Sequence, residues 1–259
     1  MENQRSLGKP QIRLPERPEE IDQDAEYCSV LLDGEWVDIR FHDYHRIYRI
    51  NGLYEQLFHE ILDCRSPDVI AKLLKEQLQR DGYDAEGLRV LDLGAGNGLV
   101  GEQLRTIGVG HLVGADIIPE AAEAARRERP EVYDAYHVGD VTAPSEETAA
   151  ALAAAKFNTL VCVAALGYAD IPPSAFRAAF NLVSDGGWIA FTIKDRFLTE
   201  EDTSGFAGFI QTCQDNGVLE VRATERYRHR LNISGEPLHY VAVVGTKHAD
   251  IPAEFTEFP

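Results

Sequence analysis

The sequence predicts an α/β fold built on a mostly parallel sheet, with a smaller, mainly helical segment in front of it. Three observations lead to this prediction. Strand-like and helix-like stretches alternate from residue 88 onward, which is typical of parallel strands joined by crossover helices. A glycine-rich turn, "GAGNG" at 94–98, follows the first of these strands. Two long strand-like runs joined by a short turn end the region and predict an antiparallel pair.

The alternating region supplies five strands and five helices. The strands are predicted at 88–93, 111–116, 134–138, 157–163 and 187–194. The helices are predicted at 98–108, 119–129, 145–155, 173–183 and near 204–216, with Ser145 as the N-cap of the third. Because the strands are short apolar runs between amphipathic helices, both faces of the sheet should be covered. The final pair follows, joined by a turn at Ser234-Gly235.

The first 84 residues have a different character. Residues 1–26 combine three prolines with many charges, which predicts a flexible arm whose removal is nearly neutral. Asp33-Gly34 lies between two apolar runs and predicts a hairpin. Helical spacing follows at 53–62, and a further helix should begin with Ser66 as N-cap and Pro67 as first residue. The predicted units are the arm 1–26, a mainly helical cap 27–84, a core 85–247 and an acidic tail 248–259.

Composition narrows the class of protein. The formal net charge of −18 is opposite to the basic surface that nucleic acids require, so a small polar substrate is favoured over DNA or RNA. No apolar run approaches the roughly 18 residues of a membrane span, and the first residues lack the apolar stretch of a secretory signal. The four cysteines are scattered without C-x-x-C spacing, and no histidine pair has zinc spacing. We therefore expect a cytoplasmic protein with neither a metal site nor a membrane partner.

The glycine-rich turn is compatible with two enzyme classes. Residues 96–101 satisfy the dinucleotide fingerprint G-x-G-x-x-G, but a similar turn binds S-adenosylmethionine (SAM). Asp92 lies two residues before the first glycine, where its carboxylate would be repelled by a pyrophosphate and attracted by the ammonium and sulfonium of SAM. Asp116 lies where either class has an acid for ribose hydroxyls. Asp140 ends the third strand and either binds adenine or simply forms a turn.

Five segments taken together resemble the motifs of class I SAM-dependent methyltransferases. They are "VLDLGAGNG", "GAD", "GDV", "FNTLVCVAAL" and "LVSDGGWIAFT", and they run in motif order across residues 50–246. The continuation "GLVGEQL" is most similar to the small-molecule branch. The resemblance implies a Rossmann-like sheet of seven strands, the last one antiparallel, with SAM as cofactor and S-adenosylhomocysteine (SAH) as product.

The resemblance also implies a set of cofactor-binding residues. The glycines would lie under the methionine part of SAM, with an acid near its ammonium, a second acid at the ribose, and further residues at the adenine and the methyl group. The glycines are Gly94, Gly96 and Gly98, the acid near the ammonium is Asp92, and the acid at the ribose is Asp116. The residues at the adenine are Ile117, Asp140 and Val141, and the residue at the methyl group is Ala164.

Departures from related motifs point to the kind of acceptor. Asn158 stands where the family usually has Asp in its fourth motif. Enzymes that methylate amino groups of nucleic acids carry Asp/Asn-Pro-Pro-Tyr/Phe after the fourth strand, whereas this chain has "IPPS" at 171–174. The paired glutamates of arginine methyltransferases are absent as well. These departures favour a small-molecule acceptor methylated at oxygen, nitrogen or carbon.

Methyl transfer is an in-line displacement whose rate comes largely from alignment, and a general base is needed only for a protonated nucleophile. The sequence therefore assigns no catalytic residue. Residues 42–62 are rich in His and Tyr and are the best cover for the site, although these tyrosines could equally pack the cap on the core. The substrate-pocket candidates lie in this segment or after the fourth and fifth strands: Tyr44, Tyr48, Tyr54, Tyr168, Asp170 and Lys194, the last for an anionic acceptor.

The predicted function is methyl transfer from SAM to a small-molecule acceptor. Two alternatives remain open at this point. One is an NAD(P)-dependent oxidoreductase, which would have to tolerate Asp92 beside a pyrophosphate. The other is a SAM-binding protein that acts on a protein partner. The sequence leaves the acceptor, the methylated atom and the oligomeric state undetermined.

Overall fold

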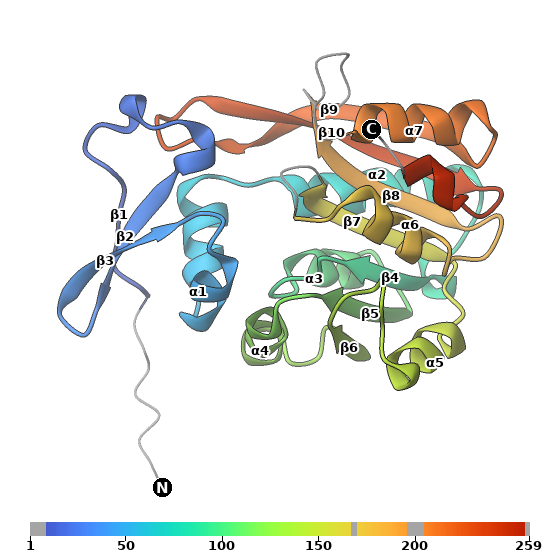
Figure 1. The fold of residues 1–259 in the computed structure, drawn as a ribbon, viewed down its shortest axis with the longest axis horizontal. Coiled ribbons are helices and arrows are strands. Elements are labelled where there is room, and N and C mark those ends of the chain that lie inside the picture. Colours follow the sequence, from blue (N-terminus) through green and yellow to red (C-terminus); the bar gives the residue numbers. More distant parts are fainter. Residues whose placement is uncertain (1–8, 167–169, 196–204, 257–259) are drawn as a thin grey trace, which may run out of the picture.

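A computed structural model describes residues 9–166, 170–195 and 205–256. Its main sheet has seven strands in the order β6-β5-β4-β7-β8-β10-β9 (Figure 1). Neighbouring strands are parallel except at β10, which is antiparallel to both β8 and β9. The predicted Rossmann-like sheet with its last strand inserted antiparallel is thus confirmed. The strands are β4 (Arg89–Leu93), β5 (His111–Asp116), β6 (Ala135–Val138), β7 (Thr159–Leu166), β8 (Trp188–Lys194), β9 (Leu219–Leu231) and β10 (Pro237–Lys247).

Helices cover both faces of this sheet. Those of the core begin and end within a few residues of the predicted bounds: α2 (Ser66–Arg80), α3 (Leu99–Thr106), α4 (Pro119–Glu128), α5 (Glu146–Ala154), α6 (Pro173–Phe180) and α7 (Phe206–Asp215). Ser145 caps α5 as predicted, since its hydroxyl accepts a hydrogen bond from the Thr148 N–H. Ser66 does not cap α2. Its side chain is buried against Tyr227 and His229 instead, because these tertiary partners compete with the helix N–H groups.

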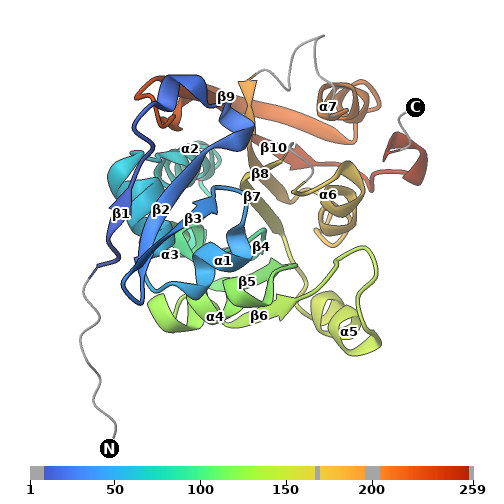
Figure 2. The ribbon, with the colours of Figure 1, turned by 60° about the vertical axis from the view of Figure 1, so that its left-hand side comes forward.

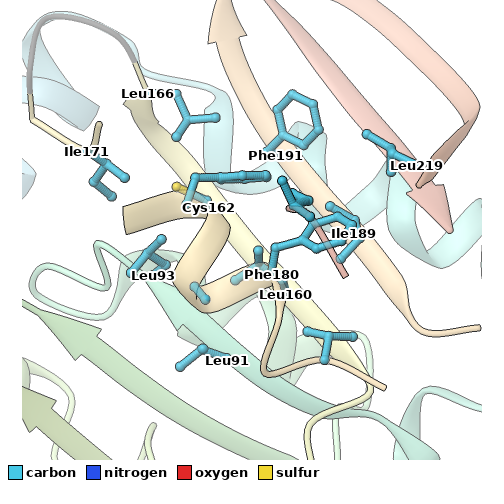
Figure 3. Close-up of a cluster of buried hydrophobic side chains, with 14 of the residues drawn as sticks. Leu91, Leu93, Leu160, Cys162, Leu166, Ile171, Phe180, Ile189, Phe191 and Leu219 are labelled. Carbon is cyan, nitrogen blue, oxygen red and sulfur yellow. The ribbon is translucent and has the colours of Figure 1, made fainter. Parts of the chain in front are cut away.

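Two apolar clusters lie on the two faces. On one face, α5, α6 and α7 pack on the sheet, where Phe180 of α6 lies in one apolar cluster with Leu160 of β7 and Phe191 of β8 (Figure 3). On the other face, α2 and α3 contribute Leu74 and Leu104 to a second cluster. Burial from both sides explains why the parallel strands are continuous apolar runs. It also holds the carboxyl ends of β4, β5 and β7 at one fixed edge.

The segment in front of the core contains a sheet of its own as well as helices. β1 (Ile12–Arg13), β2 (Tyr27–Leu32) and β3 (Glu35–Arg40) form an antiparallel sheet, followed by α1 (Tyr44–Arg49) and a π-helix (Glu55–Ile61). The hairpin turn is where it was predicted, at Asp33-Gly34, and both of its residues have positive φ.

The predicted arm is in contact with the rest of the chain from residue 9 onward. Lys9 pairs with Glu60, β1 pairs with β2, and the carboxylate of Glu26 is buried against Arg230 of β9. In the predicted tail, Ile251 is buried and its carbonyl accepts hydrogen bonds from Arg177 and Asn181 near the end of α6.

The cap lies over one end of the core through contacts to α4 (Figures 1 and 2). Arg49 pairs with Glu120 at 2.6 Å, and the Gly52 N–H donates to Glu128. Arg127 donates to the carbonyl of Tyr48. These bonds set α1 above the loops that follow β4 and β5.

Candidate active site

A cavity of about 490 Å³ lies at the carboxyl ends of β4, β5 and β7, between these strands and the cap. This is the edge where open α/β sheets bind ligands. Its walls come from the strand ends, the loops that follow them and the cap: Tyr44, Tyr48, Tyr54, Leu93, Gly94, Ala115, Asp116, Ile117, Ile118, Gly139, Asp140, Val141, Thr142, Val163, Ala164, Ala165, Asp170, Ile171, Pro172, Ser174 and Ala175.

The glycine turn after β4 reaches this cavity through Gly94. Gly94 has a φ of +73° and Gly96 a φ of +55°, so both occupy a conformation that favours glycine. A Cβ atom on Gly96 would lie 2.6 Å from the Tyr48 hydroxyl. The close approach of the cap to the turn therefore depends on this glycine. The Tyr136 hydroxyl donates to the Gly96 carbonyl and fixes the turn from the β6 side.

Asp116, at the end of β5, holds the same turn through its carboxylate. One oxygen accepts the Gly96 N–H and the other accepts the Ile118 N–H, each at 2.9 Å. Burial raises the pKa of Asp116, while these backbone hydrogen bonds oppose the rise. Each oxygen has a second lone pair and can accept another hydrogen bond. Ile117, beside it, is 63% exposed at the cavity wall.

Asp140, after β6, forms a turn and also lines the cavity. Its carboxylate accepts hydrogen bonds from the N–H and the hydroxyl of Thr142, which lower its pKa. Adenine binding and turn formation by Asp140 are therefore compatible, because a single carboxylate oxygen accepts both hydrogen bonds of the turn.

The end of β7 carries a strained residue. Ala164 has a φ of +55°, a left-handed conformation that costs a residue with a Cβ roughly 1–2 kcal/mol. The strand register shifts between Cys162 and Leu166, so the chain bulges here into the cavity wall. The Ala164 N–H donates to the Thr192 hydroxyl of β8 at 2.8 Å.

Three cap tyrosines form the opposite wall. The rings of Tyr44, Tyr48 and Tyr54 follow one another, with centroid distances of 6.1 and 5.2 Å. Burial raises the pKa of all three, which keeps their hydroxyls protonated. Asp170 lies in the wall with Tyr44, and its carboxylate is 3.9 Å from the His42 imidazole. Burial raises the pKa of Asp170, and His42 partly offsets the rise.

Residues 56–242 match the family model described as "Methyltransferase domain". This match covers more than half of the chain. The chain belongs to this methyltransferase family.

Individual relatives agree with this assignment over part of their length. The ubiquinone biosynthesis O-methyltransferases of Paraburkholderia phymatum and Thiobacillus denitrificans are each 32% identical over 110 residues, which is 42% of this chain and 46% of theirs. The chain thus spans about half the length of these curated relatives. This chain is also 13% identical in sequence to a SAM-dependent methyltransferase from Clostridium acetobutylicum whose crystal structure is known. It aligns with a TM-score of 0.51 over 76% of this chain and 97% of that one, which shows a shared fold.

Most of the residues predicted for the methyltransferase site meet at the cavity. Its walls include the cofactor candidates Gly94, Asp116, Ile117, Asp140, Val141 and Ala164, and the substrate candidates Tyr44, Tyr48, Tyr54 and Asp170. Gly96 does not line the walls but binds Asp116, which does. Tyr168 lies outside the described residues.

Three candidates lie elsewhere. Asp92 is buried beneath the glycine turn, where one carboxylate oxygen accepts a hydrogen bond from the Tyr133 hydroxyl and the other has no hydrogen-bond partner in the described part of the chain. Burial raises the pKa of Asp92 to about 7. Gly98 faces Arg129 and Tyr133 rather than the cavity. Lys194 is buried and donates to the side chain of Gln23, because residues 23–26 pack against this end of the sheet.

Several residues of the cavity wall are not recognisable as site residues from the sequence. Val163, Ile171 and Thr142 lie in strand ends or loops whose apolar or small side chains look like ordinary packing or turn residues. Pro172 and Ser174 also line the cavity, although the "IPPS" segment is informative in the sequence only through its departure from another motif. Over the described part of the chain, no three His, Cys, Asp or Glu residues are grouped so that they could hold a metal ion.

Proposed function

We propose that this methyltransferase-family protein transfers a methyl group from SAM to a small-molecule acceptor by in-line displacement. The observation that carries the proposal is the charge of the cavity wall. Asp116, Asp140 and Asp170 line it, and none of its described wall residues is Lys, Arg or His. A wall of this kind suits a ligand with an ammonium and a sulfonium, whereas it would repel the pyrophosphate of a dinucleotide. Family membership supports the same choice.

The wall residues fit SAM part by part. Gly94 allows close approach, because a Cβ there would lie 3.0 Å from the Ile171 side chain. Asp116 has lone pairs for ribose hydroxyls, and the exposed Ile117 offers an apolar surface to a planar base. Asp92 lies buried beneath the turn with one oxygen that has no hydrogen-bond partner among the described residues, and a cation bound above the turn would favour its charged form. When bound, SAM supplies an electrophilic methyl group on a positively charged sulfur.

The protein's part in the reaction is alignment and exclusion of water. The glycine turn and Asp116 would fix the cofactor, and the three cap tyrosines would hold the acceptor against it. In this division, residues 85–247 bind the cofactor and residues 27–84 cover it. Because Lys194 does not line the cavity, we propose a neutral or cationic acceptor instead of an anionic one.

We further propose an oxygen nucleophile, since the curated relatives are named O-methyltransferases. A hydroxyl acceptor must lose its proton as the bond to the methyl carbon forms. Asp170 is suited to accept this proton, because it lies beside the cap tyrosines and burial raises its pKa. Asp170→Asn should lower kcat while the affinity for SAH stays unchanged.

A location in the cytoplasm also belongs to this proposal. It is supported by the four cysteines, all buried and free, which match a reducing compartment. No helix of the described residues combines the length and the apolarity needed to cross a bilayer. Cell fractionation with an antibody to the protein would test the location.

Calorimetric titration with SAM, SAH, NAD and NADP tests the cofactor. We expect SAM and SAH to bind and the two dinucleotides to give no heat of binding. Binding of NAD together with no response to SAM would overturn the proposal. Turnover is then tested with small phenols and with the same phenols carrying a carboxylate. The uncharged compounds should be methylated faster, and SAM that binds without turnover on any acceptor would instead favour action on a protein partner.

A further inference from the structure

A row of buried polar side chains leads away from the cavity wall at Ala164. The Ala164 N–H donates to the Thr192 hydroxyl of β8 at 2.8 Å, and the Thr192 hydroxyl interacts with the Tyr227 hydroxyl of β9, whose pKa it lowers. Tyr227 lies 2.5 Å from the Ser66 hydroxyl, and Ser66 lies 2.7 Å from Nδ1 of His229. The four side chains beyond Ala164 are all more than nine-tenths buried. The row therefore runs through the interior of the protein from the cavity wall to His229.

The arrangement of strands makes this row possible. β10 separates β8 from β9, so the Tyr227 side chain must pass over β10 to reach Thr192. Ala242 is the register partner of Thr192 on β10, and it lies in the same buried cluster as Tyr227. A larger side chain in place of Ala242 would occupy the path of the tyrosine ring.

The hydrogen bonds of this row have one direction that satisfies every member. Thr192 accepts from the Ala164 N–H and donates to Tyr227, Tyr227 donates to Ser66, and Ser66 donates to Nδ1 of His229. In the opposite direction, Thr192 would accept two hydrogen bonds, and its own proton would have no acceptor among the hydrogen bonds found in the described residues. Buried hydroxyls of this kind are costly when unsatisfied, so the first direction is favoured.

The far end of the row lies at the joint between cap and core. Ser66 begins α2, and the short segment before it leads back to the cap. Backbone bonds tie this segment to β9, since the Arg65 N–H donates to the His229 carbonyl and the Leu231 N–H donates to the Leu62 carbonyl. His229 also stacks on Tyr240, with ring centroids 4.0 Å apart. The near end of the row is thus a strained residue in the cavity wall, and the far end is the attachment of the cap.

We propose that Thr192, Tyr227, Ser66 and His229 form a positioning chain that holds Ala164 in its left-handed conformation. The chain ties the wall of the cavity to the joint of the cap, so that both sides of the site are fixed together. This inference rests on the proposed function only in taking the cavity as the cofactor site. None of the four side chains lines the cavity, so their effect on a ligand is indirect.

The direction of the chain makes a prediction that needs no ligand. His229 must be neutral, with its proton on Nε2, because Nδ1 accepts from Ser66. Burial lowers the pKa of His229 well below its ordinary value, which keeps the ring neutral at pH 7. Nitrogen NMR of the protein labelled in histidine should show an unprotonated Nδ1 for this residue. A proton on Nδ1 would overturn the proposed chain, whatever the cofactor is.

The effect on the cavity is tested with Thr192→Val and a matched control. Thr246→Val is the control, because the Thr246 hydroxyl is buried in the same sheet and has no hydrogen-bond partner among the residues that the structure describes. We expect Thr192→Val to weaken SAH binding roughly tenfold, since Ala164 loses the hydrogen bond that holds its left-handed conformation. Thr246→Val should bind SAH like the wild type, and Thr192→Ser should restore the affinity. Equal affinities for the two valine variants would overturn the proposal.

A double variant separates positioning from a general loss of stability. Glycine adopts the left-handed conformation without strain, so Ala164→Gly should make the hydroxyl of Thr192 less necessary. In the Ala164→Gly background, Thr192→Val should therefore weaken SAH binding much less than it does alone. An equal loss in both backgrounds would contradict the positioning role. If Thr192→Val fails to fold, Tyr227→Phe serves in its place, and wild-type affinity of that variant would refute the chain.

Discussion

Asp116→Asn tests the cofactor site most directly, because the carboxylate has two separable roles. In the wild type each of its oxygens accepts one backbone N–H, from Gly96 and Ile118. An amide supplies only one oxygen, and its NH₂ group would face the other N–H. One buried donor then has no acceptor, which costs about 1–3 kcal/mol. For a chain of this size the melting temperature should fall by roughly 2–4 °C per kcal/mol.

The same substitution removes a charged acceptor from the ribose site. A hydrogen bond to a charged group contributes about 1.5–3 kcal/mol, so SAH binding should weaken roughly ten- to hundredfold. Both quantities are measured on one sample, the affinity by calorimetry and the melting temperature by circular dichroism. Asp116→Ala is less informative, because it strands both backbone N–H groups at once.

Asp134→Asn is the matched control for this experiment. The Asp134 carboxylate also accepts a backbone N–H, from Leu112 of β5, but it lies outside the cavity wall. This variant should lose stability and bind SAH like the wild type. If the two asparagine variants bind SAH equally well, Asp116 does not hold the cofactor and the second motif has been misplaced.

Three further predictions concern stability. Because burial raises the pKa of Asp92 from 3.8 to about 7, its contribution to the free energy of unfolding is fully present below pH 3.8. This contribution should be lost as pH rises to about 7, at up to about 1.4 kcal/mol per pH unit. Asp92→Asn should lack this slope when the free energy of unfolding is measured by denaturant titration at several pH values. If the wild type and the variant depend on pH in the same way, the raised pKa is refuted. Lys247 is 1% exposed and donates to the Val183 carbonyl and to Asp250. Lys247→Met should therefore lower the melting temperature without changing SAH binding. An unchanged melting temperature would contradict this prediction. Deleting residues 1–26 should lower the free energy of unfolding, measured in urea, by about 3–5 kcal/mol, because Arg230 would lose its buried partner Glu26. An unchanged free energy of unfolding would favour the flexible arm that the sequence alone predicts.

The core could be predicted from the sequence because each of its elements is encoded locally. Strands β4, β5, β7 and β8 are short apolar runs, and the helices between them carry their own start signals, such as Ser145 before α5. The cofactor side of the cavity follows from the same pattern. Residues at or just after the carboxyl ends of parallel strands must meet at one edge, which is why Gly94, Asp116 and Ala164 come together.

The errors occur where a side chain has a partner far away in the sequence. Ser66 has the identity and position of an N-cap, yet Tyr227 and His229 bind its hydroxyl from 161 and 163 residues away. Lys194 ends a strand at the correct edge, but Gln23 from the N-terminal segment binds it there. Local sequence patterns hold no information about such partners, so a residue type and its spacing predict a role that tertiary contacts can override.

The second half of the cavity shows the same limit on a larger scale. The helical spacing at 53–62 indicates a buried face in the cap but not what that face covers. The cap is attached to α4 through pairs such as Arg49 with Glu120, which lie 71 residues apart and resemble ordinary surface charges in the sequence. No one of these pairs contributes much energy. Together with the apolar contact of Tyr48 on Ala121 and Ala124, however, they determine which tyrosines reach the glycine turn. The identity of the acceptor thus depends on a docking geometry assembled from individually weak contacts, and that is why the sequence predicts the cofactor more sharply than it predicts the substrate.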